Sequence, residues 1–351
     1  MANIKENDVI LALKNVIDPE LQKDLVTLGM IRDIKIVEND VYFTIMLTTP
    51  ACPLRNYLEQ EARSAIASIP GVNEIKIKMD AQVPKDARIA QELDLQINHV
   101  VAVASGKGGV GKTTVAVNIA IALAQSGAKV GLMDADIYGP NVPGMVGVEK
   151  IPSPQDNKII PAEVYGIKVM SIGFLVKEGQ PLIWRGPLLH STIRQFLMDV
   201  NWGELDYLIV DMPPGTGDVQ LSLSQTIPIS GAIIVTLPQK ISTDDASRGI
   251  EMFQKLNTPI IGIIENMSYL ELPDGKIMQV FGEGGGQRLA DKYAIPLLGA
   301  IPMDSKLREG GDEGKPIVIS APDSKVAKLF KDISCSLAAQ LSIRAISNME
   351  S

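Results

Sequence analysis

Cysteine is scarce in this sequence of 351 residues, which contains only Cys52 and Cys335. Two cysteines cannot build the disulfide framework of a small secreted protein, and such scarcity is typical of a reducing compartment. The first residues show no apolar stretch behind a basic start, so we expect no secretory signal. Together these absences predict a cytoplasmic protein.

Long apolar runs and an excess of positive charge are also missing. No apolar run approaches the roughly 20 residues that a membrane-spanning helix needs. The formal net charge is −8, so the overall balance does not favour nucleic-acid binding. We therefore expect neither a membrane nor a nucleic acid among the partners.

The length of the chain indicates two domains, and the residue pattern changes near position 100. Residues 1–80 are predicted to form a small α+β domain, because apolar residues alternate along 41–47 and 75–79 around a helical segment at 54–69. The polar residues 81–98 are predicted to be a linker.

Residues 99–345 are predicted to form an α/β domain with a mostly parallel sheet and helices on both faces. Its strands are continuous apolar runs, as expected of strands that are buried on both faces. Helical segments separate the runs, which lie at residues 100–104, 130–133, 207–210, 232–237, 260–264 and 296–301. A last amphipathic helix is predicted at about 325–343.

A glycine-rich loop joins the first of these strands to a helix and matches the phosphate-binding pattern G-x-x-x-x-G-K-[ST]. Its glycines let several backbone N–H groups point at one anion, and the following helix adds a partial positive charge. Lys112 is predicted to reach the β- and γ-phosphates of ATP, and Thr113 to bind Mg²⁺. The predicted ATP-binding residues of the loop are Gly106, Lys107, Gly108, Gly109, Val110, Gly111, Lys112, Thr113 and Thr114.

Lys107 is a second lysine inside the glycine run. It makes the loop resemble that of the deviant Walker group, which includes MinD, ParA and nitrogenase iron protein. The resemblance implies that Lys107 crosses a dimer interface and neutralises charge on the partner's phosphates in the transition state. The alternative is a solvated loop lysine.

Acidic residues end two of the predicted strands. Asp211 ends an apolar run as a Walker B acid does, and is predicted to hold Mg²⁺ through water. By resemblance to the same group, Asp136 lies in switch I and orients the attacking water, while Asp134 lies close to the metal. Alternatively, Asp134 caps the next segment.

Two further segments complete the predicted site. The glycines of residues 213–218, which follow Asp211, suit a switch II loop that approaches the γ-phosphate. Asn266 follows the strand at 260–264, and by resemblance to related ATPases it reads the edge of the adenine. The alternative for Asn266 is a turn residue.

Longer stretches around these motifs resemble the Mrp/ApbC family of iron–sulfur cluster carrier ATPases. The resemblance covers about residues 95–340, and the segment 48–54 resembles a small domain of iron–sulfur assembly factors. It implies a homodimer that hydrolyses ATP, binds a labile cluster such as [4Fe–4S] and transfers it to apoprotein clients. The matching stretches are residues 134–141, 184–187, 211–218 and 281–286.

The chain departs from this family in one respect. Family members carry C-x-x-C shortly after the Glu-Asn-Met segment, whereas residues 265–275 of this chain contain no cysteine. Because iron–sulfur clusters require soft thiolates, Cys52 becomes the leading candidate ligand. We expect it at the N-cap of the helix that starts after Pro53, where a thiolate is favoured. A small buried hydrophobe is the alternative for Cys52, and it is favoured for Cys335.

Two other functions remain open from the sequence. A positioning ATPase like MinD or ParA would need a basic surface or a basic amphipathic helix, and residues 339–351 contain one arginine, Arg344. An ATP-dependent adaptor that has lost cluster binding is the second. Arg185, in the stretch 184–187, is predicted to bind an anion, to contact the partner or to fix a turn.

Overall fold

The computed structural model describes residues 4–86, 89, 96–175 and 186–350, and the chain forms two compact units. The first unit contains Met1–Pro84 and Ala338–Ser351, and the second contains Lys85–Leu337. Residues 87–88 and 90–95 of the predicted linker, like Trp184 and Arg185, lie outside the described residues. The sequence-based division assigned residues up to 345 to the second domain. The difference arises because the end of the last helix packs with the first unit, where Ser342 Oγ donates to the Thr48 carbonyl (3.2 Å).

In its described residues the first unit has a three-stranded sheet, the short β1–β2 pair, helices α1 and α2, and the end of α12. Strand β4 pairs antiparallel with β3 and parallel with β5, and helix α2 makes the crossover between β4 and β5. Alternate residues of β4, such as Val41, Phe43 and Ile45, are buried against Leu58 and Ala62 of α2. The elements are α1 (Glu6–Leu13), β1 (Ile17–Asp18), β2 (Lys23–Asp24), β3 (Ile31–Val37), β4 (Asp40–Leu47), α2 (Arg55–Ala67) and β5 (Ile75–Ala81).

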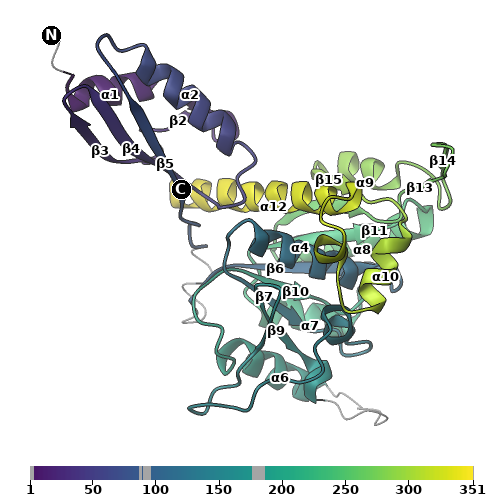
Figure 1. Cartoon of the computed structure of the whole chain (residues 1–351). Coiled ribbons are helices and arrows are strands. Elements are labelled where there is room, and N and C mark those ends of the chain that lie inside the picture. Colours follow the sequence, from purple (N-terminus) through teal and green to yellow (C-terminus); the bar gives the residue numbers. More distant parts are fainter. Residues whose placement is uncertain (1–3, 87–88, 90–95, 176–185, 351) are drawn as a thin grey trace. The chain divides into compact units, whose positions relative to one another are not determined.

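A large sheet forms the centre of the second unit (Figure 1). Among the described residues it has eight strands in the order β15-β12-β11-β6-β10-β7-β9-β8, and only β8 runs antiparallel to its neighbour. Its strands are β6 (Ile97–Ser105), β7 (Val130–Asp134), β8 (Ala162–Val164), β9 (Ile167–Ser171), β10 (Leu205–Asp211), β11 (Gly231–Thr236), β12 (Ile260–Glu265) and β15 (Leu297–Ala300).

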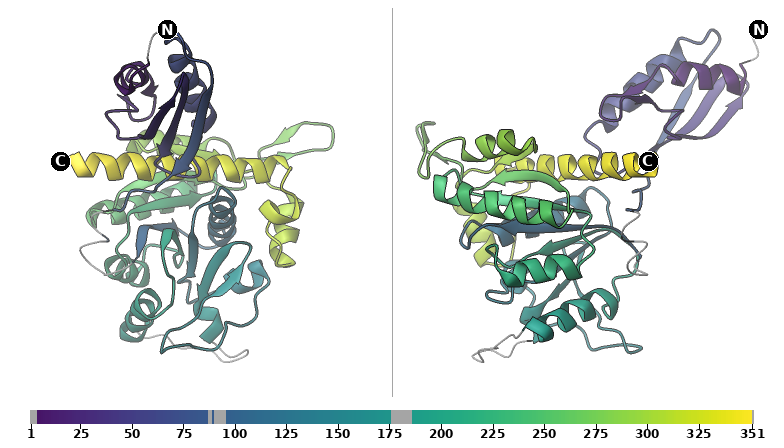
Figure 2. Two further views of the ribbon diagram at one scale, coloured as in Figure 1. Left: turned by 60° about the vertical axis from the view of Figure 1, so that its left-hand side comes forward. Right: turned by 180° about the vertical axis from the view of Figure 1, so that it is seen from behind.

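Helices cover both faces of this sheet (Figure 2). One face packs against α6, α7, α8 and α9, whose apolar residues share a core with β6, β10 and β11. Helices α4 and α12 pack together, since Ser334 Oγ donates to the Ile119 carbonyl (3.5 Å). The helices are α4 (Lys112–Gln125), α5 (Val142–Val146), α6 (Gly186–Met198), α7 (Asp218–Thr226), α8 (Lys240–Lys255), α9 (Gly285–Tyr293), α10 (Ser305–Asp312), α11 (Ile317–Ser320) and α12 (Lys325–Glu350), with a 3₁₀ turn at Ile172–Leu175.

The structure confirms the predicted fold class, with strands that the sequence pattern did not predict. Strands β8 and β9 extend the sheet beyond β7. The hairpin of β13 (Leu270–Glu271) and β14 (Ile277–Met278) projects from the second unit (Figure 1). Ile277 and Met278 are exposed, so the hairpin lacks the periodic burial on which the strand predictions depend. No helix in the described part of the chain is long and apolar enough to cross a membrane.

Helix α12 gives a direct test of this packing, because Phe330 is fully buried. We expect Phe330→Ala to lower the free energy of unfolding of the second unit by about 3–5 kcal/mol. The exposed neighbour Lys331 offers a matched control, with Lys331→Ala within about 0.5 kcal/mol of wild type. Urea unfolding followed by tryptophan fluorescence reports on this unit, which holds Trp184 and Trp202. Equal midpoints for the two variants would contradict the assigned packing.

Candidate functional site

The glycine-rich loop lies between β6 and α4, at the carboxyl edge of the parallel strands. Gly109 and Gly111 have φ values of 78° and 81°, a left-handed conformation that side chains rarely adopt. A Cβ atom on Gly109 would meet nothing within 4 Å, whereas one on Gly106 would lie 2.2 Å from the Asp245 carbonyl carbon. The glycines therefore serve two purposes: Gly109 lets the loop curl, and Gly106 lets it pass close to α8.

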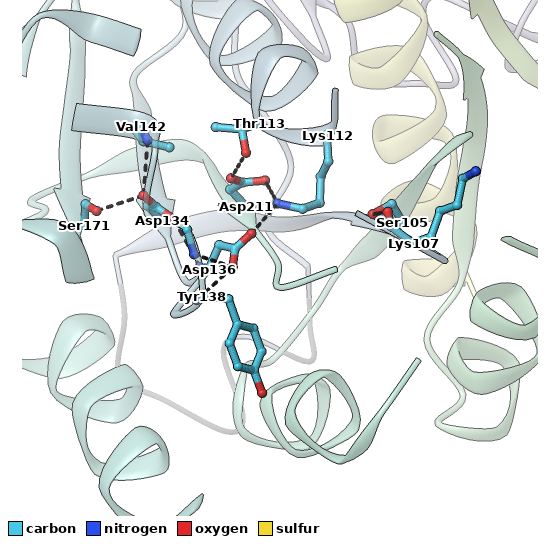
Figure 3. A network of polar contacts seen from close by, with 11 residues as sticks. Ser105, Lys107, Lys112, Thr113, Asp134, Asp136, Tyr138, Val142, Ser171 and Asp211 are labelled. Atoms are coloured by element: carbon cyan, nitrogen blue, oxygen red, sulfur yellow. Dashed lines mark hydrogen bonds and ion pairs between the residues drawn. The ribbon is translucent and has the colours of Figure 1, made fainter. Parts of the chain in front are cut away.

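Lys112 and Thr113, the first residues of α4, both contact the carboxylate of Asp211 at the end of β10 (Figure 3). The Lys112 ammonium donates to Asp211 Oδ1 at 2.5 Å, and Thr113 Oγ1 donates to Oδ2 at 2.7 Å. Burial raises the pKa of Asp211, and these two partners oppose the shift. The structure thus brings together the predicted phosphate-binding lysine and the two predicted Mg²⁺ ligands.

Asp134 and Asp136 follow on the neighbouring strand β7, where Asp134 pairs in register with Asp211. Asp134 accepts hydrogen bonds from the backbone N–H groups of Asp136 (3.1 Å) and Val142 (3.3 Å) and from Ser171 Oγ (2.8 Å). Burial, together with the charge of Asp211, raises the pKa of Asp134 to about 8. Because Val142 is the first residue of α5, Asp134 accepts a hydrogen bond from the start of that helix. This contact fits the alternative in which Asp134 caps the next segment.

Asp136 stands closer to the phosphate loop than Asp134 does. Its Oδ2 lies 3.5 Å from the Lys112 ammonium, and its Oδ1 accepts from the N–H groups of Tyr138 (3.1 Å) and Gly139 (3.3 Å). The backbone contacts fix the loop after β7 around the carboxylate. One carboxylate oxygen therefore faces the site.

A cavity of about 850 Å³ extends from the phosphate loop. Every predicted ATP-binding residue except Gly106 lines it, as does Asp136. Asn266 forms part of the wall, where its Nδ2 donates to the Val110 carbonyl (2.8 Å). Its Oδ1 is buried and accepts no hydrogen bond from the described residues. The cavity is large enough for a nucleotide, and Asn266 in its wall carries one buried acceptor without a partner among the described residues.

Lys107 differs from Lys112 in its surroundings. Its backbone carbonyl accepts from Ser105 Oγ (2.9 Å), while its side chain points away from the Lys112–Asp211 contact (Figure 3). In the described part of the chain its ammonium pairs with no carboxylate within 4.0 Å. Lys107 is thus held at the backbone and left half-exposed at the mouth of the cavity.

The segment after Asp211 also reaches the site. The Gly215 N–H donates to the Ser105 carbonyl (3.0 Å), and Pro214 lines the cavity. Helix α7 follows, with Gly217 as its N-cap residue. The predicted switch II residues therefore lie beside the phosphate loop.

Some residues of the site were not predicted. Met303, which precedes α10, and Ser305 and Arg308 of α10 also line the cavity. The N-cap of α10, Asp304, which accepts from the Lys306 N–H (2.7 Å), was the available sequence signal. Ser171, the hydroxyl partner of Asp134, carries no such signal.

The expectation that Cys52 occupies a helix N-cap is wrong. Helix α2 begins at Arg55 with Leu54 as its N-cap residue. The Arg55 N–H donates to the Cys52 carbonyl (3.4 Å), so Cys52 opens a turn in which Pro53 takes the position that suits its fixed φ. Cys52 is half-buried and packs against the apolar core of the first unit. Cys52 therefore lies two residues before the N-cap of α2.

Cys335 lies on α12 in the second unit and is also half-buried, and burial raises the pKa of its thiol. No group of three or more histidine, cysteine or acidic side chains in the described residues is arranged to hold a metal ion.

The site has the parts that define a P-loop NTPase. A glycine-rich loop joins a buried parallel strand to a helix, and the first lysine and threonine of this helix contact an acid on the neighbouring strand of the sheet. Residues 96–338 match the model of the NUBPL iron-transfer P-loop NTPases of the ParA group, and the chain belongs to this family. Residues 6–78 match the model of an iron–sulfur cluster assembly protein.

Relatives agree with this assignment. The chain is 50% identical to the iron-sulfur cluster carrier protein of Synechocystis, over 96% of this chain and 98% of the relative. It is 42% identical to the chloroplastic Fe-S cluster assembly factor HCF101 of Oryza sativa, over 93% of this chain and 62% of the relative. A solved nucleotide-binding protein from Archaeoglobus fulgidus in complex with ADP is 42% identical, with a TM-score of 0.57, over 66% of this chain and 92% of that one. The cell division ATPase MinD of Pyrococcus furiosus shares the fold, at 23% identity and a TM-score of 0.52, over 72% of this chain and 99% of that one.

Two glycines of the phosphate loop are expected to differ in how strongly a substitution affects stability. Gly106→Ala forces a Cβ against backbone atoms of α8, and we expect it to lower the free energy of unfolding by about 2 kcal/mol. Gly108→Ala meets only Pro214, at 3.9 Å, so its stability should stay within about 0.5 kcal/mol of wild type. Thermal unfolding without nucleotide measures both. The steric assignment fails if Gly106→Ala is as stable as Gly108→Ala.

Proposed function

We propose that this chain is an ATP-hydrolysing iron–sulfur cluster carrier that acts as a cytoplasmic homodimer and delivers clusters to apoprotein clients. The observation that carries the ATPase part is the convergence of Lys112, Thr113 and Asp211 beside a nucleotide-sized cavity. The family and the names of the relatives support the carrier part. In this proposal residues 99–345 form the ATPase domain, with the end of α12 from Ala338 grouped in the first compact unit, and residues 1–80, joined by the linker 81–98, form the assembly-type domain.

The donor set of the site suits Mg²⁺. Thr113 Oγ1 lies 2.7 Å from Asp211 Oδ2, and hard oxygen donors are what this cation prefers. Thr113 and Asp211 would hold the ion, Asp211 through water. When bound, Mg²⁺ neutralises charge on the phosphates during hydrolysis.

The chain's own residues then divide the work on ATP. Backbone N–H groups of residues 106–114 cradle the phosphates, and Lys112 turns from Asp211 to the β- and γ-phosphates. Asp136 orients the attacking water through the carboxylate oxygen that faces the site. Asn266 offers its unused Oδ1 to an amino group of the base. Asp134 holds the loop around Asp136 through its contacts with Val142 and Ser171.

Lys107 is proposed to complete the site of the partner protomer. We expect Lys107→Ala to bind ATP within about threefold of wild type and to lose roughly 10³-fold in kcat, because the lysine acts on transition-state charge. Lys150→Ala, at an exposed position, should hydrolyse ATP like wild type. Steady-state hydrolysis and nucleotide titration give both quantities.

Mixing variants tests whether Lys107 acts across the dimer. Lys107→Ala and Asp136→Ala are each expected to be inactive, but a mixed dimer contains one complete site. Random exchange of equal amounts should restore about a quarter of wild-type activity, because half the dimers are mixed and each has one working site. Mixtures as inactive as their components would show that Lys107 works within its own protomer.

The missing C-x-x-C favours a second candidate, an ATP-dependent adaptor without a cluster. Anaerobic reconstitution separates the two. For a carrier with Cys52 as a ligand, wild type and Cys335→Ser should hold about four iron and four sulfide per dimer, and Cys52→Ser should hold far less. Iron and sulfide analysis of the purified dimers measures this. Wild type at background iron would leave the adaptor as the function.

A further inference from the structure

The glycine-rich segment at 281–286 has no part in the functions assigned so far, yet its packing is tight. Gly284 is the N-cap of α9, with φ 64°. A Cβ on Gly285 would lie 2.1 Å from the Pro238 carbonyl oxygen, and one on Gly286 would lie 2.8 Å from Glu265 Cβ. These glycines therefore allow the N-terminus of α9 to pack closely against Pro238, which follows β11, and Glu265, which ends β12.

Glu265, the last residue of β12, receives this helix terminus. Its side chain is buried, with 3% of its surface exposed. Oε2 accepts from the Gly286 N–H and Oε1 accepts from Ser268 Oγ, each at 2.5 Å. No lysine or arginine of the described residues pairs with it within 4.0 Å. The partial positive charge at the N-terminus of α9 therefore stabilises the buried carboxylate of Glu265.

The contact between Glu265 and Ser268 closes a strained turn. Met267, between them, has φ 50°, which a side chain without a local hydrogen bond rarely adopts. Backbone bonds hold the ends of the turn, since the Asn266 N–H donates to Thr236 and the Ser268 N–H donates to Ile301 (2.8 Å each). A strained residue persists only when its surroundings over-determine it. Besides these backbone bonds, the hydrogen bond from Ser268 Oγ to Glu265 holds the turn through side chains.

The turn forms the wall of the nucleotide cavity. Asn266 and Met267 both line the cavity, and successive residues at a strand end point in opposite directions. Glu265 accordingly reaches α9 while Asn266 reaches the phosphate loop at Val110. The end of β12 is held from both sides.

We infer that Glu265 is a positioning residue for base selection: by anchoring the turn to α9, it aims Asn266 at an adenine amino group. This inference rests on the proposed binding of ATP. Glu265 contacts no part of the nucleotide in this role. Its loss should change how the base is read and leave phosphate binding intact.

The test compares ATP, GTP and inorganic pyrophosphate as ligands, with affinities from calorimetric titration. Glu265→Ala should weaken ATP binding roughly tenfold and GTP and pyrophosphate binding less than twofold, so the preference for ATP over GTP falls. Glu265→Gln should keep the wild-type preference, because its amide can accept from Gly286 and donate to Ser268. The exposed Glu283→Ala is the matched control and should equal wild type.

Every outcome bears on the inference. A uniform loss for all three ligands in Glu265→Ala, or none, would reduce Glu265 to a structural role and overturn it, as would a wild type that binds ATP and GTP equally. If Glu265→Ala does not fold, Ser268→Ala removes one of the two donors and should lower the ATP preference about threefold. An unchanged preference in Ser268→Ala would then overturn the inference. A wild type that binds no ATP would instead sink the proposed function.

Discussion

The buried contact between Lys112 and Asp211 is the interaction on which the site depends. It joins the start of α4 to the end of β10, next to the parallel strand β6 that leads into the loop. Removing one partner of such a pair typically costs about 3–5 kcal/mol, since the other charge is left buried. The Lys112 ammonium lies within 4.0 Å of two carboxyl groups, those of Asp136 and Asp211. Two carboxyl groups thus share one ammonium at this edge of the sheet, and in the proposed function a divalent cation bound with the nucleotide would balance them.

Close backbone packing is the second constraint at this edge. Gly106 passes α8 and Gly285 meets Pro238 at distances that no Cβ tolerates. Both contacts bring a loop onto the carboxyl end of the sheet, where the strands converge on the cavity. Glycine in these motifs thus does more than expose N–H groups to an anion. It sets how closely α8 and α9 approach the carboxyl end of the sheet, as the positions of Gly106, Gly285 and Gly286 show.

Much of the fold and the centre of the site could be predicted from the sequence, because strong local signals specify them. Continuous apolar runs marked six strands of the large sheet, and the spacing of Gly111, Lys112 and Thr113 marked the loop between β6 and α4. Strands β8 and β9 were not predicted because β8 is an edge strand of three residues and Lys168 interrupts the apolar run of β9. Ser171 escaped because its contact with Asp134 depends on strand order, which periodicity does not reveal. The error at Cys52 had a local cause: proline fits a turn as well as it fits the first helical position.

The proposed [4Fe–4S] cargo needs more thiolates than one chain contains. A [4Fe–4S] cluster takes four thiolates, and each chain holds two cysteines, Cys52 and Cys335. These cysteines lie in different compact units, and burial raises the pKa of Cys335, which favours its thiol over the thiolate that iron binds. A dimer that uses Cys52 alone offers two thiolates, and the remaining positions must come from oxygen or nitrogen donors or from a client. Such a site holds iron less tightly than four thiolates do. Since a carrier has to give up its cluster, an incomplete thiolate set is compatible with delivery, whereas long-term storage would require the full set.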